Sequence, residues 1–419
     1  MSTQSLAAPN AGAGETTGTQ RTRVVILDFG SQYTHLIARR VRECGVYSEV
    51  MRFDAAPAEI AQGTGAIILS GGPSSIYDEN APKPDPAIFE LGIPMLGICY
   101  GMQAMSQALG GRVASGTTRE YGPMGFEPEG EHRLFKGLPA SSKVWMSHGD
   151  EVAEPPEGFE VLGRSTDGKI ASMGSDERRF YGLQFHPEVV HTDNGKRIVE
   201  NYVHEICGIA GDWSPASFVE ETVAAIREQV GDATVVCALS GGVDSSVMSV
   251  LLHRAIGDRL VPIFVDNGVL RKNEDHDVIE RLRSKLGLNV DIVDARDRFL
   301  SKLAGVEDPE KKRKIIGTEF IRVFEEEAKK VEGARFLAQG TLYQYVIESI
   351  SVKGPSATIK SHHNVGGLPE HMDLDLIEPL KTLFKDEVRK VGAELGIDPD
   401  ILGRHPFPGP GLAVRILGE

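Results

Sequence analysis

Two short glycine-containing segments of this 419-residue chain hold the residues best suited to chemistry. Segment 97–101 (GICYG) places Cys99 between two glycines, directly after an apolar run. Segment 240–246 (SGGVDSS) also follows an apolar run and combines glycines with hydroxyl groups and one carboxylate. A thiol on a strand-to-helix turn is typical of a nucleophile, and backbone N–H groups at a helix start are typical of a phosphate site. We therefore expect two chemistries on one chain, joined by a shared intermediate.

Cys99 is the candidate nucleophile. Its flanking glycines permit the sharp turn of a nucleophile elbow, and the expected helix 102–109 would direct its N-terminal dipole at the sulfur and favour the thiolate. A base is required, and His186 in segment 185–188 (FHPE) is the candidate. If this segment is extended, Glu188 shares a face with His186 and could orient the imidazole. A buried core cysteine and an incidental His-Pro turn are the structural alternatives.

An oxyanion formed at this thiol would need backbone N–H donors. The residue after the nucleophile, Tyr100, is one candidate donor. The turn 70–73 (SGGP), which follows an expected strand at 66–69, could provide the other. A Gly-Gly-Pro turn alone is weak support for this role.

The strings GICYGMQ, LSGGP and QFHPE together resemble the class I, triad-type glutamine amidotransferases, over about residues 24–207. The resemblance implies that Cys99 attacks the side-chain amide of glutamine and releases ammonia. It further implies that His186 is general base and acid and that Glu188 orients it. Gly72 and Tyr100 would supply the oxyanion N–H groups.

The second segment lacks the Gly-Lys-Ser/Thr of a Walker A loop. Its short form resembles the loop of ATP pyrophosphatases, which cleave ATP between the α and β phosphates. The resemblance makes Asp244 the expected Mg²⁺ ligand; a polar loop that merely caps a helix is the alternative. The strand 260–265 ends at Asp266, at the sheet edge where a nucleotide base or ribose would lie. The expected ATP-binding residues are Ser240, Gly241, Gly242, Val243, Asp244, Ser245, Ser246, Val265, Asp266 and Gly340.

Four further strings, KRKIIGTEF, QGTLY, IKSHHNVGGLPE and HPFPGPGLAVRILGE, resemble the GMP synthases, the glutamine-hydrolysing enzymes of purine biosynthesis. This resemblance spans about residues 23–419 and implies three substrates: glutamine, ATP and xanthosine monophosphate (XMP). ATP with Mg²⁺ would adenylate XMP, and ammonia would then displace AMP to give GMP. Arg313 would contact the substrate, and Lys360, His362 and His363 would belong to a lid. No tightly bound organic cofactor is expected.

Composition limits the partners. The net charge of −15, from 45 Lys and Arg against 60 Asp and Glu, argues against general affinity for nucleic acid or anionic membranes. No apolar run reaches the roughly 18 residues of a membrane span. Four cysteines without a Cys-x-x-Cys pair suggest neither a disulfide framework nor zinc, so we expect a cytoplasmic protein. The run 311–314 (KKRK) concentrates positive charge, and predicts either a solvated helix face or an anion contact.

Alternation of short apolar runs with helical stretches predicts an α/β fold with two open, mostly parallel sheets in series. We expect a disordered extension (1–22), an amidotransferase domain (23–207) and an ATP pyrophosphatase domain (208–403). Residues 404–419 would begin a C-terminal dimerisation domain that is mostly absent, since the resembled family is homodimeric through it. The expected strands are 24–27, 66–69, 94–98, 234–239, 260–265, 290–293 and 336–338, with an irregular, antiparallel region at 112–184. The expected helices are 35–43, 102–109, 195–207, 215–229, 245–255, 275–286 and a charged stretch at 308–331.

Two departures from the resembled family weaken the prediction of full activity. Gln344-Tyr345 replaces the usual Pro-Asp, which leaves Glu348 as the nearest acid in that segment. The chain also stops at Glu419, so a form retaining mainly glutaminase activity, or an ammonia-supplying subunit, is one alternative. Another ammonia-using ATP pyrophosphatase, such as an NAD synthetase, is the second alternative. A plain α/β binding protein is disfavoured because two sites would then be coincidental.

Overall fold

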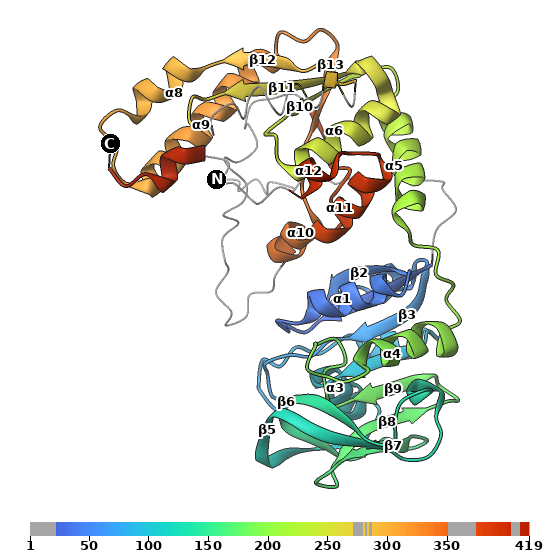
Figure 1. Cartoon of the computed structure of the whole chain (residues 1–419). Helices are drawn as coiled ribbons and strands as arrows, with labels where there is room; N and C mark the ends of the chain where they lie inside the picture. The colour runs from blue at the N-terminus through green and yellow to red at the C-terminus, as the bar shows by residue number, and fades with distance from the viewer. Residues whose placement is uncertain are drawn as a thin grey trace, which may run out of the picture.

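The computed structural model describes residues 22–270, 280, 283–284, 287–350, 374–403 and 411–418, and leaves out the side chains of 116–119 and 347–350. It contains a nine-stranded sheet followed in the chain by a five-stranded sheet. Figure 1 shows them as two bodies, which the segment 208–214 joins along the chain. The predicted α/β fold with two open sheets in series is confirmed. The predicted lid residues Lys360, His362 and His363 and the N-terminal residues 1–21 lie outside the described residues.

The first sheet has a parallel half and an antiparallel half. Its order is β2-β1-β3-β4-β9-β8-β7-β5-β6, and the pairs from β2 to β9 are parallel. β4 is buried along its length and β3 over its last four residues, as expected for a parallel sheet covered on both faces. The strands are β1 (Arg23–Asp28), β2 (Tyr47–Arg52), β3 (Thr64–Leu69), β4 (Met95–Ile98), β5 (Arg112–Pro128), β6 (Ser142–Glu154), β7 (Glu160–Ser165), β8 (Ile170–Ser175) and β9 (Phe180–Leu183).

Short helices connect these strands. The C-terminal helix of this half changes from α-helical to π-helical hydrogen bonding at Asn201, within the single helix predicted over 195–207. The helical elements are α1 (Thr34–Glu43), α2 (Pro57–Ala61), η1 (Pro86–Glu90), α3 (Tyr100–Ala108), η2 (Arg133–Phe135), α4 (Gly195–Glu200) and η3 (Asn201–Ile206).

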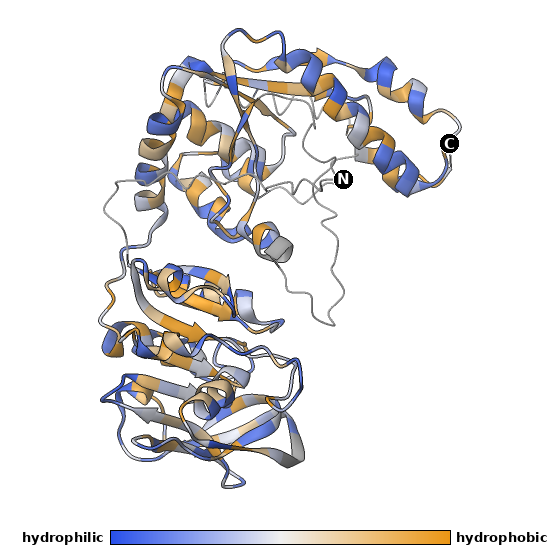
Figure 2. Ribbon diagram, turned by 180° about the vertical axis from the view of Figure 1, so that it is seen from behind, coloured by the Kyte–Doolittle hydropathy of each residue, from blue (hydrophilic) through white to orange (hydrophobic). Residues whose placement is uncertain are grey.

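The second sheet is parallel throughout, in the order β12-β11-β10-β13-β14. Figure 2 shows that hydrophobic residues concentrate on its strands and on the inner faces of its helices. The strands are β10 (Thr234–Ala238), β11 (Leu260–Asp266), β12 (Asp291–Asp294), β13 (Ala334–Ala338) and β14 (Asp375–Ile377). The helical elements are α5 (Pro215–Val230), α6 (Val243–Ile256), η4 (Gly257–Arg259), α8 (Arg296–Leu303), α9 (Pro309–Ala328), α10 (Tyr343–Ile350), α11 (Lys385–Glu394), α12 (Pro399–Leu402) and η5 (Gly411–Arg415).

Most predicted elements are present within a few residues, but three differences bear on the sites. The edge strand β2 and the helix α11 were not predicted. The region 112–184 is not wholly antiparallel, because β9 pairs in parallel with β4. Most of the helix predicted at 275–286 lies outside the described residues. No helix among the described residues is long and apolar enough to cross a membrane.

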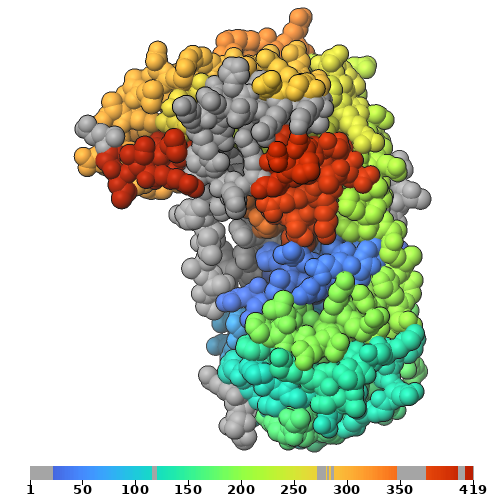
Figure 3. All heavy atoms as spheres, viewed as in Figure 1, coloured from blue at the N-terminus to red at the C-terminus, as the bar shows by residue number. Residues whose placement is uncertain are grey.

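The two halves meet where α1 and β2 face the start of α11, as Figure 3 shows for the blue and red surfaces. The guanidinium of Arg42 on α1 is 2% exposed and lies 3.0 Å from a carboxylate oxygen of Glu387 on α11. It also donates to the carbonyl of Thr382 at 2.9 Å. Four aromatic rings surround it at 4.5 to 5.6 Å, those of Tyr47, Trp213, Tyr343 and Phe384.

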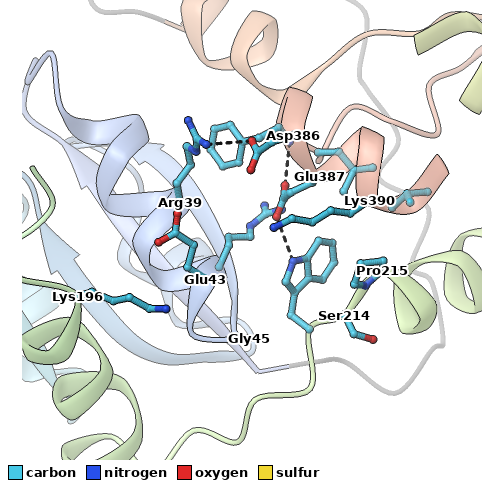
Figure 4. A pocket seen from close by; sticks show the side chains of 14 residues that line it. Arg39, Glu43, Gly45, Lys196, Ser214, Pro215, Asp386, Glu387 and Lys390 are labelled. Atoms are coloured by element: carbon cyan, nitrogen blue, oxygen red, sulfur yellow. Dashed lines mark hydrogen bonds and ion pairs between the residues drawn. The ribbon is translucent and has the colours of Figure 1, made fainter. Parts of the chain in front are cut away.

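A pocket of about 410 Å³ opens beside this contact. Figure 4 shows charged side chains from both halves around it, including Arg39, Asp386 and Lys390. Neither Cys99 nor any residue of the 240–246 loop lines it. The pocket therefore belongs to the junction between the halves and not to either candidate site.

Candidate active sites

The predicted elbow is present at Cys99. Its backbone has φ 51° and ψ −108°, between the end of β4 and the first residue of α3. Residues other than glycine rarely adopt a positive φ, so the strain here marks a functional position. A β-carbon added at Gly101 would lie 2.3 Å from the carbonyl oxygen of Leu69, and one at Gly97 would lie 2.6 Å from a backbone nitrogen. Both flanking glycines are thus required by close backbone approach.

His186 and Glu188 form a buried pair. Nδ1 of His186 lies 2.7 Å from Oε1 of Glu188, and both side chains are at most 4% exposed. The segment that carries them consists of bends and turns, so the expectation of an extended segment was wrong, although the two side chains do meet. The carbonyl of Glu188 accepts a hydrogen bond from Nε of Arg40 on α1 at 3.0 Å. The second carboxylate oxygen, Oε2, is buried without a hydrogen-bond partner.

The imidazole of His186 also interacts with Cys99. Burial lowers the pKa of His186, but the charge of Glu188 and the hydrogen bond and charge of Cys99 outweigh it and hold this pKa well above its usual value. The favoured state is an imidazolium between a carboxylate and a sulfur. This arrangement suits a thiol nucleophile activated by an adjacent base.

The turn predicted to supply an oxyanion donor lies against both groups. A β-carbon added at Gly71 would be 3.0 Å from Cε1 of His186 and 3.7 Å from Cβ of Cys99. A β-carbon at Gly72 would be 2.8 Å from the carbonyl oxygen of Phe29 and 3.4 Å from the ring of Tyr100. The structure therefore brings together Cys99 and the predicted donors, with no room for side chains at either glycine.

Three buried polar residues on α3 and β6, Gln103, His148 and Asp150, were not predicted. Nε2 of Gln103 donates to the carbonyl of Asp150 at 2.6 Å, and the carboxylate of Asp150 accepts from the hydroxyl of Ser75 at 2.6 Å. Nδ1 of His148 on β6 lies 3.0 Å from the same carbonyl, and burial lowers the pKa of this histidine to about 4. The run SHGD at 147–150, with polar residues inside a buried strand, was the available signal.

The second site begins at the end of β10. Gly241 has φ 72° and Gly242 caps α6, so Asp244 and Ser245 lie in the first helical turn, slightly earlier than predicted. The hydroxyls of Ser240 and Ser245 are 3.1 Å apart, and the hydroxyl of Ser246 is buried without a hydrogen-bond partner. The loop thus holds hydroxyls and a carboxylate at a helix N-terminus, where an anion is stabilised.

Lys385 is the main residue that the sequence interpretation missed here. Its Nζ lies 2.6 Å from Oδ1 of Asp244, across 141 positions of sequence. It is the first residue of α11, so it places an ammonium group beside a loop that lacks the Walker lysine. Gly340 is also close, because a β-carbon there would lie 3.7 Å from that of Asp244.

The neighbouring strand ends supply the remaining predicted nucleotide residues. β10 lies between β11 and β13, so their carboxyl ends meet at one edge of the sheet. Asp266 ends β11, and its carboxylate accepts from the backbone N–H of Gly268 at 3.0 Å. The side chain of Val265 is in the core, which leaves only its backbone available to a ligand.

Residues of the basic run 311–314 make different contacts. Lys312 is 4% exposed and donates to the carbonyls of Ile416 and Gly418, so the expectation of a solvated face was wrong for this residue. Arg313 forms a two-point contact with Glu310 within α9, at 2.7 and 2.8 Å. Among the described residues, none of its contacts joins it to the 240–246 loop.

The substitution of Pro-Asp by Gln344-Tyr345 has a structural counterpart. The ring of Tyr345 packs against the core of the second half. An acid nevertheless lies beside this segment, because Glu378 accepts a hydrogen bond from the hydroxyl of Thr341. The side chain of Glu348 lies outside the described ones.

Comparisons with known proteins agree with this division. The family model for class-I glutamine amidotransferases matches residues 25–206, and the model for NAD synthase matches residues 217–320. A protein of Maridesulfovibrio salexigens named GMP synthase [glutamine-hydrolyzing] is 57% identical over 95% of this chain and 78% of its own length. Proteins of the same name from Solidesulfovibrio magneticus and Geobacillus kaustophilus are 58% and 57% identical, over 96% and 94% of this chain.

The NAD synthase match covers only part of the second half, whereas the alignments with the relatives cover almost the whole chain. This chain spans 78% of the length of those relatives. The resemblance derived from the sequence motifs is confirmed: the chain belongs to the family of glutamine-hydrolysing GMP synthases.

Proposed function

We propose that this protein makes GMP from XMP, using glutamine as nitrogen donor and ATP as the source of free energy. Ammonia forms at Cys99 in the first half and is consumed beside the 240–246 loop in the second. The relatives that carry the glutamine-hydrolysing GMP synthase name support this function over 95% of the chain. The strained thiol beside a His-Glu pair is the observation that carries the first step.

In the first half, the sulfur of Cys99 attacks the amide carbon of glutamine. His186 gives a proton to the leaving nitrogen, so that ammonia departs and a γ-glutamyl thioester remains. A water molecule then attacks the thioester, gives a proton to His186 and releases glutamate. Glu188 stabilises the imidazolium before the first proton transfer and after the second, and the N–H groups of Gly72 and Tyr100 would face the oxyanion of each tetrahedral intermediate.

In the second half, the oxygen on C2 of XMP attacks the α-phosphorus of ATP, and pyrophosphate leaves. Ammonia then displaces AMP from C2 to give GMP. The adenylation is needed because a purine carbonyl oxygen is a poor leaving group, whereas AMP is a good one. The 240–246 loop would hold the pyrophosphate, with the ammonium of Lys385 as a second source of positive charge.

Mg²⁺ would accompany ATP at Asp244. Magnesium is usually held by one or two carboxylates together with substrate phosphates, and a carboxylate at the start of α6 fits that requirement. Substrate phosphates and water molecules would supply the further ligands. The ion would neutralise phosphate charge when bound. Arg313 and the segment with Lys360, His362 and His363 would contact the substrates.

The experiment is XMP-dependent release of pyrophosphate, measured together with GMP formation, first with glutamine and then with ammonium chloride. We expect Cys99→Ala to lose the glutamine reaction and to keep the ammonia reaction. Asp244→Asn should lose both. Equal turnover of wild type and Cys99→Ala with glutamine as the only donor would refute the assignment of the nucleophile.

A further inference from the structure

The ring of Tyr33 contacts the imidazole of His186, which Glu188 and Cys99 also contact. Its ring centroid is 5.3 Å from that of His186, and the two ring planes meet at 74°. Perpendicular arrangements of this kind place the positive edge of one ring against the negative face of the other. They also bring an imidazolium within the roughly 6 Å over which an aromatic ring attracts a cation. With the face of the Tyr33 ring toward the imidazole, the contact is stronger when His186 is charged.

The position of Tyr33 is fixed by its own backbone. It caps the N-terminus of α1, and its carbonyl accepts from the N–H groups of Leu36 and Ile37 at 2.9 and 3.1 Å. Its N–H donates to the hydroxyl of Ser31 at 3.0 Å. Because Ile37 is buried in the core, the backbone from which the Tyr33 ring extends is held in place.

The imidazole of His186 needs such a contact. Glu188 holds it at Nδ1 through one carboxylate oxygen, while the other oxygen has no partner. The hydrogen bonds to Glu188 and Cys99 fix the two ends of the ring but leave its faces without a polar contact. The turn at Gly71 limits the ring on the Cε1 side. Tyr33 provides a further constraint, and it comes from an element that carries no predicted catalytic group.

We propose that Tyr33 is a positioning residue, which holds the imidazolium of His186 toward Cys99 through its aromatic ring. This inference rests on the proposed glutaminase reaction. Among the described residues, the hydroxyl of Tyr33 has no hydrogen-bond partner, so the ring carries the effect and the hydroxyl does not. The charged or titratable groups that face His186 from the other elements are Glu188, Cys99 and His148.

The test compares Tyr33→Phe, which keeps the ring, with Tyr33→Leu, which removes it. Exposed Gln32 provides a control for disturbance of the loop, as Gln32→Ala. For glutamine hydrolysis, we expect Tyr33→Phe and Gln32→Ala to stay within about twofold of wild type. Tyr33→Leu should lose roughly threefold to thirtyfold in kcat, the range of a cation–aromatic contact, with KM for glutamine unchanged.

A second measurement does not depend on glutamine turnover. The rate at which iodoacetamide alkylates Cys99 is followed against pH. Loss of the ring should shift the alkaline limb of this profile, which reports the imidazolium, to lower pH in Tyr33→Leu but not in Tyr33→Phe. If wild type alkylates normally but hydrolyses no glutamine, the proposed function fails while the alkylation profile still tests Tyr33.

Two results would overturn the proposal. One is equal behaviour of the Leu and Phe variants in both measurements. The other is a loss in Tyr33→Leu that lies in KM alone, because Tyr33 would then contact glutamine and not His186. Should Tyr33→Leu fail to fold, Tyr33→Met removes the ring with less change in volume and is expected to give the same two losses.

Discussion

Replacement of Arg42 by alanine should loosen the contact between the two halves. The guanidinium is 2% exposed, and its partner carboxylate on Glu387 is 11% exposed, so the substitution leaves a nearly buried negative charge without its cation. Removing one member of a buried pair generally costs about 3–5 kcal/mol. Glu387 keeps hydrogen bonds from Nε1 of Trp213 and the backbone of Phe384, which places the expected loss near the lower end. About 3 kcal/mol corresponds to roughly a hundredfold change in the ratio of docked to undocked molecules.

Arg39→Ala is the matched control on the same helix. Arg39 pairs with Asp386 at 3.3 Å, but both side chains are more than 40% exposed. Exposed pairs contribute about 0–1 kcal/mol, so this variant should change the docked population by less than about tenfold. The two substitutions remove the same charge one helical turn apart, but only Arg42 is buried, with aromatic rings and the Thr382 carbonyl around it.

Trp213 reports the contact directly, because its indole packs against Arg42 at 4.8 Å. The chain has two tryptophans, so a Trp145→Phe background isolates its fluorescence. We expect Arg42→Ala to shift the Trp213 emission to longer wavelength and to speed proteolysis of the linker at 208–214. Arg39→Ala should do neither. Identical emission and proteolysis in the two variants would refute the argument from burial.

Three further outcomes follow from the sites. Gly101→Ala should abolish glutamine hydrolysis, measured as glutamate release, because its β-carbon would lie 2.3 Å from a carbonyl oxygen. Lys385→Met should raise the KM for ATP in pyrophosphate release by about tenfold, because it removes the cation beside Asp244. The raised pKa of His186 gives stability that is present below its usual pKa and lost as pH rises through the raised value. Thermal unfolding of the first half should therefore occur at lower temperature as the pH rises, and Glu188→Gln should flatten this dependence.

Each of these outcomes has a control. Gly242→Ala adds a β-carbon that would meet only a serine hydroxyl, at 3.4 Å, and should keep glutamine hydrolysis. Lys381→Gln removes an exposed lysine close to Lys385 in sequence and should leave the KM for ATP unchanged. The respective reasoning fails if Gly101→Ala hydrolyses glutamine at the wild-type rate, if Lys385→Met matches Lys381→Gln, or if Glu188→Gln keeps the full alkaline loss of stability.

The parts of the sites that were predictable are those fixed by local backbone. Cys99 and the 240–246 loop each lie between a strand and a helix. Gly97 and Gly101 are required by close approach, and Gly241 by its positive φ. Such requirements act within a few residues, so they leave a local pattern. The His186–Glu188 pair was also predictable because two residues separate the groups, even though the segment is a turn.

The parts that were missed depend on contacts between distant segments. Lys385 reaches Asp244 across 141 positions, and Arg42 reaches Glu387 across 345. Nothing in the sequence around Lys385 or Arg42 indicates its partner, because a charged residue on a helix is usually exposed to solvent. β2 was missed for a related reason: one of its buried residues is the polar Ser48, so its sequence lacks an apolar alternation, and pairing with β1 stabilises it.

The arginines of α1 show how far the tertiary context decides the role of a residue. A helix turns by about 100° per residue, so Arg40 and Arg42 point to nearly opposite sides. Arg40 donates to the backbone of Glu188 in the first site, whereas Arg42 is buried against α11 of the second half. A helix that reads as amphipathic, with a charged outer face, is thus in contact with protein on both sides. The charged side chains of α1 therefore form contacts between elements. Replacing Arg40 should affect the first site, whereas replacing Arg42 should affect the contact with α11.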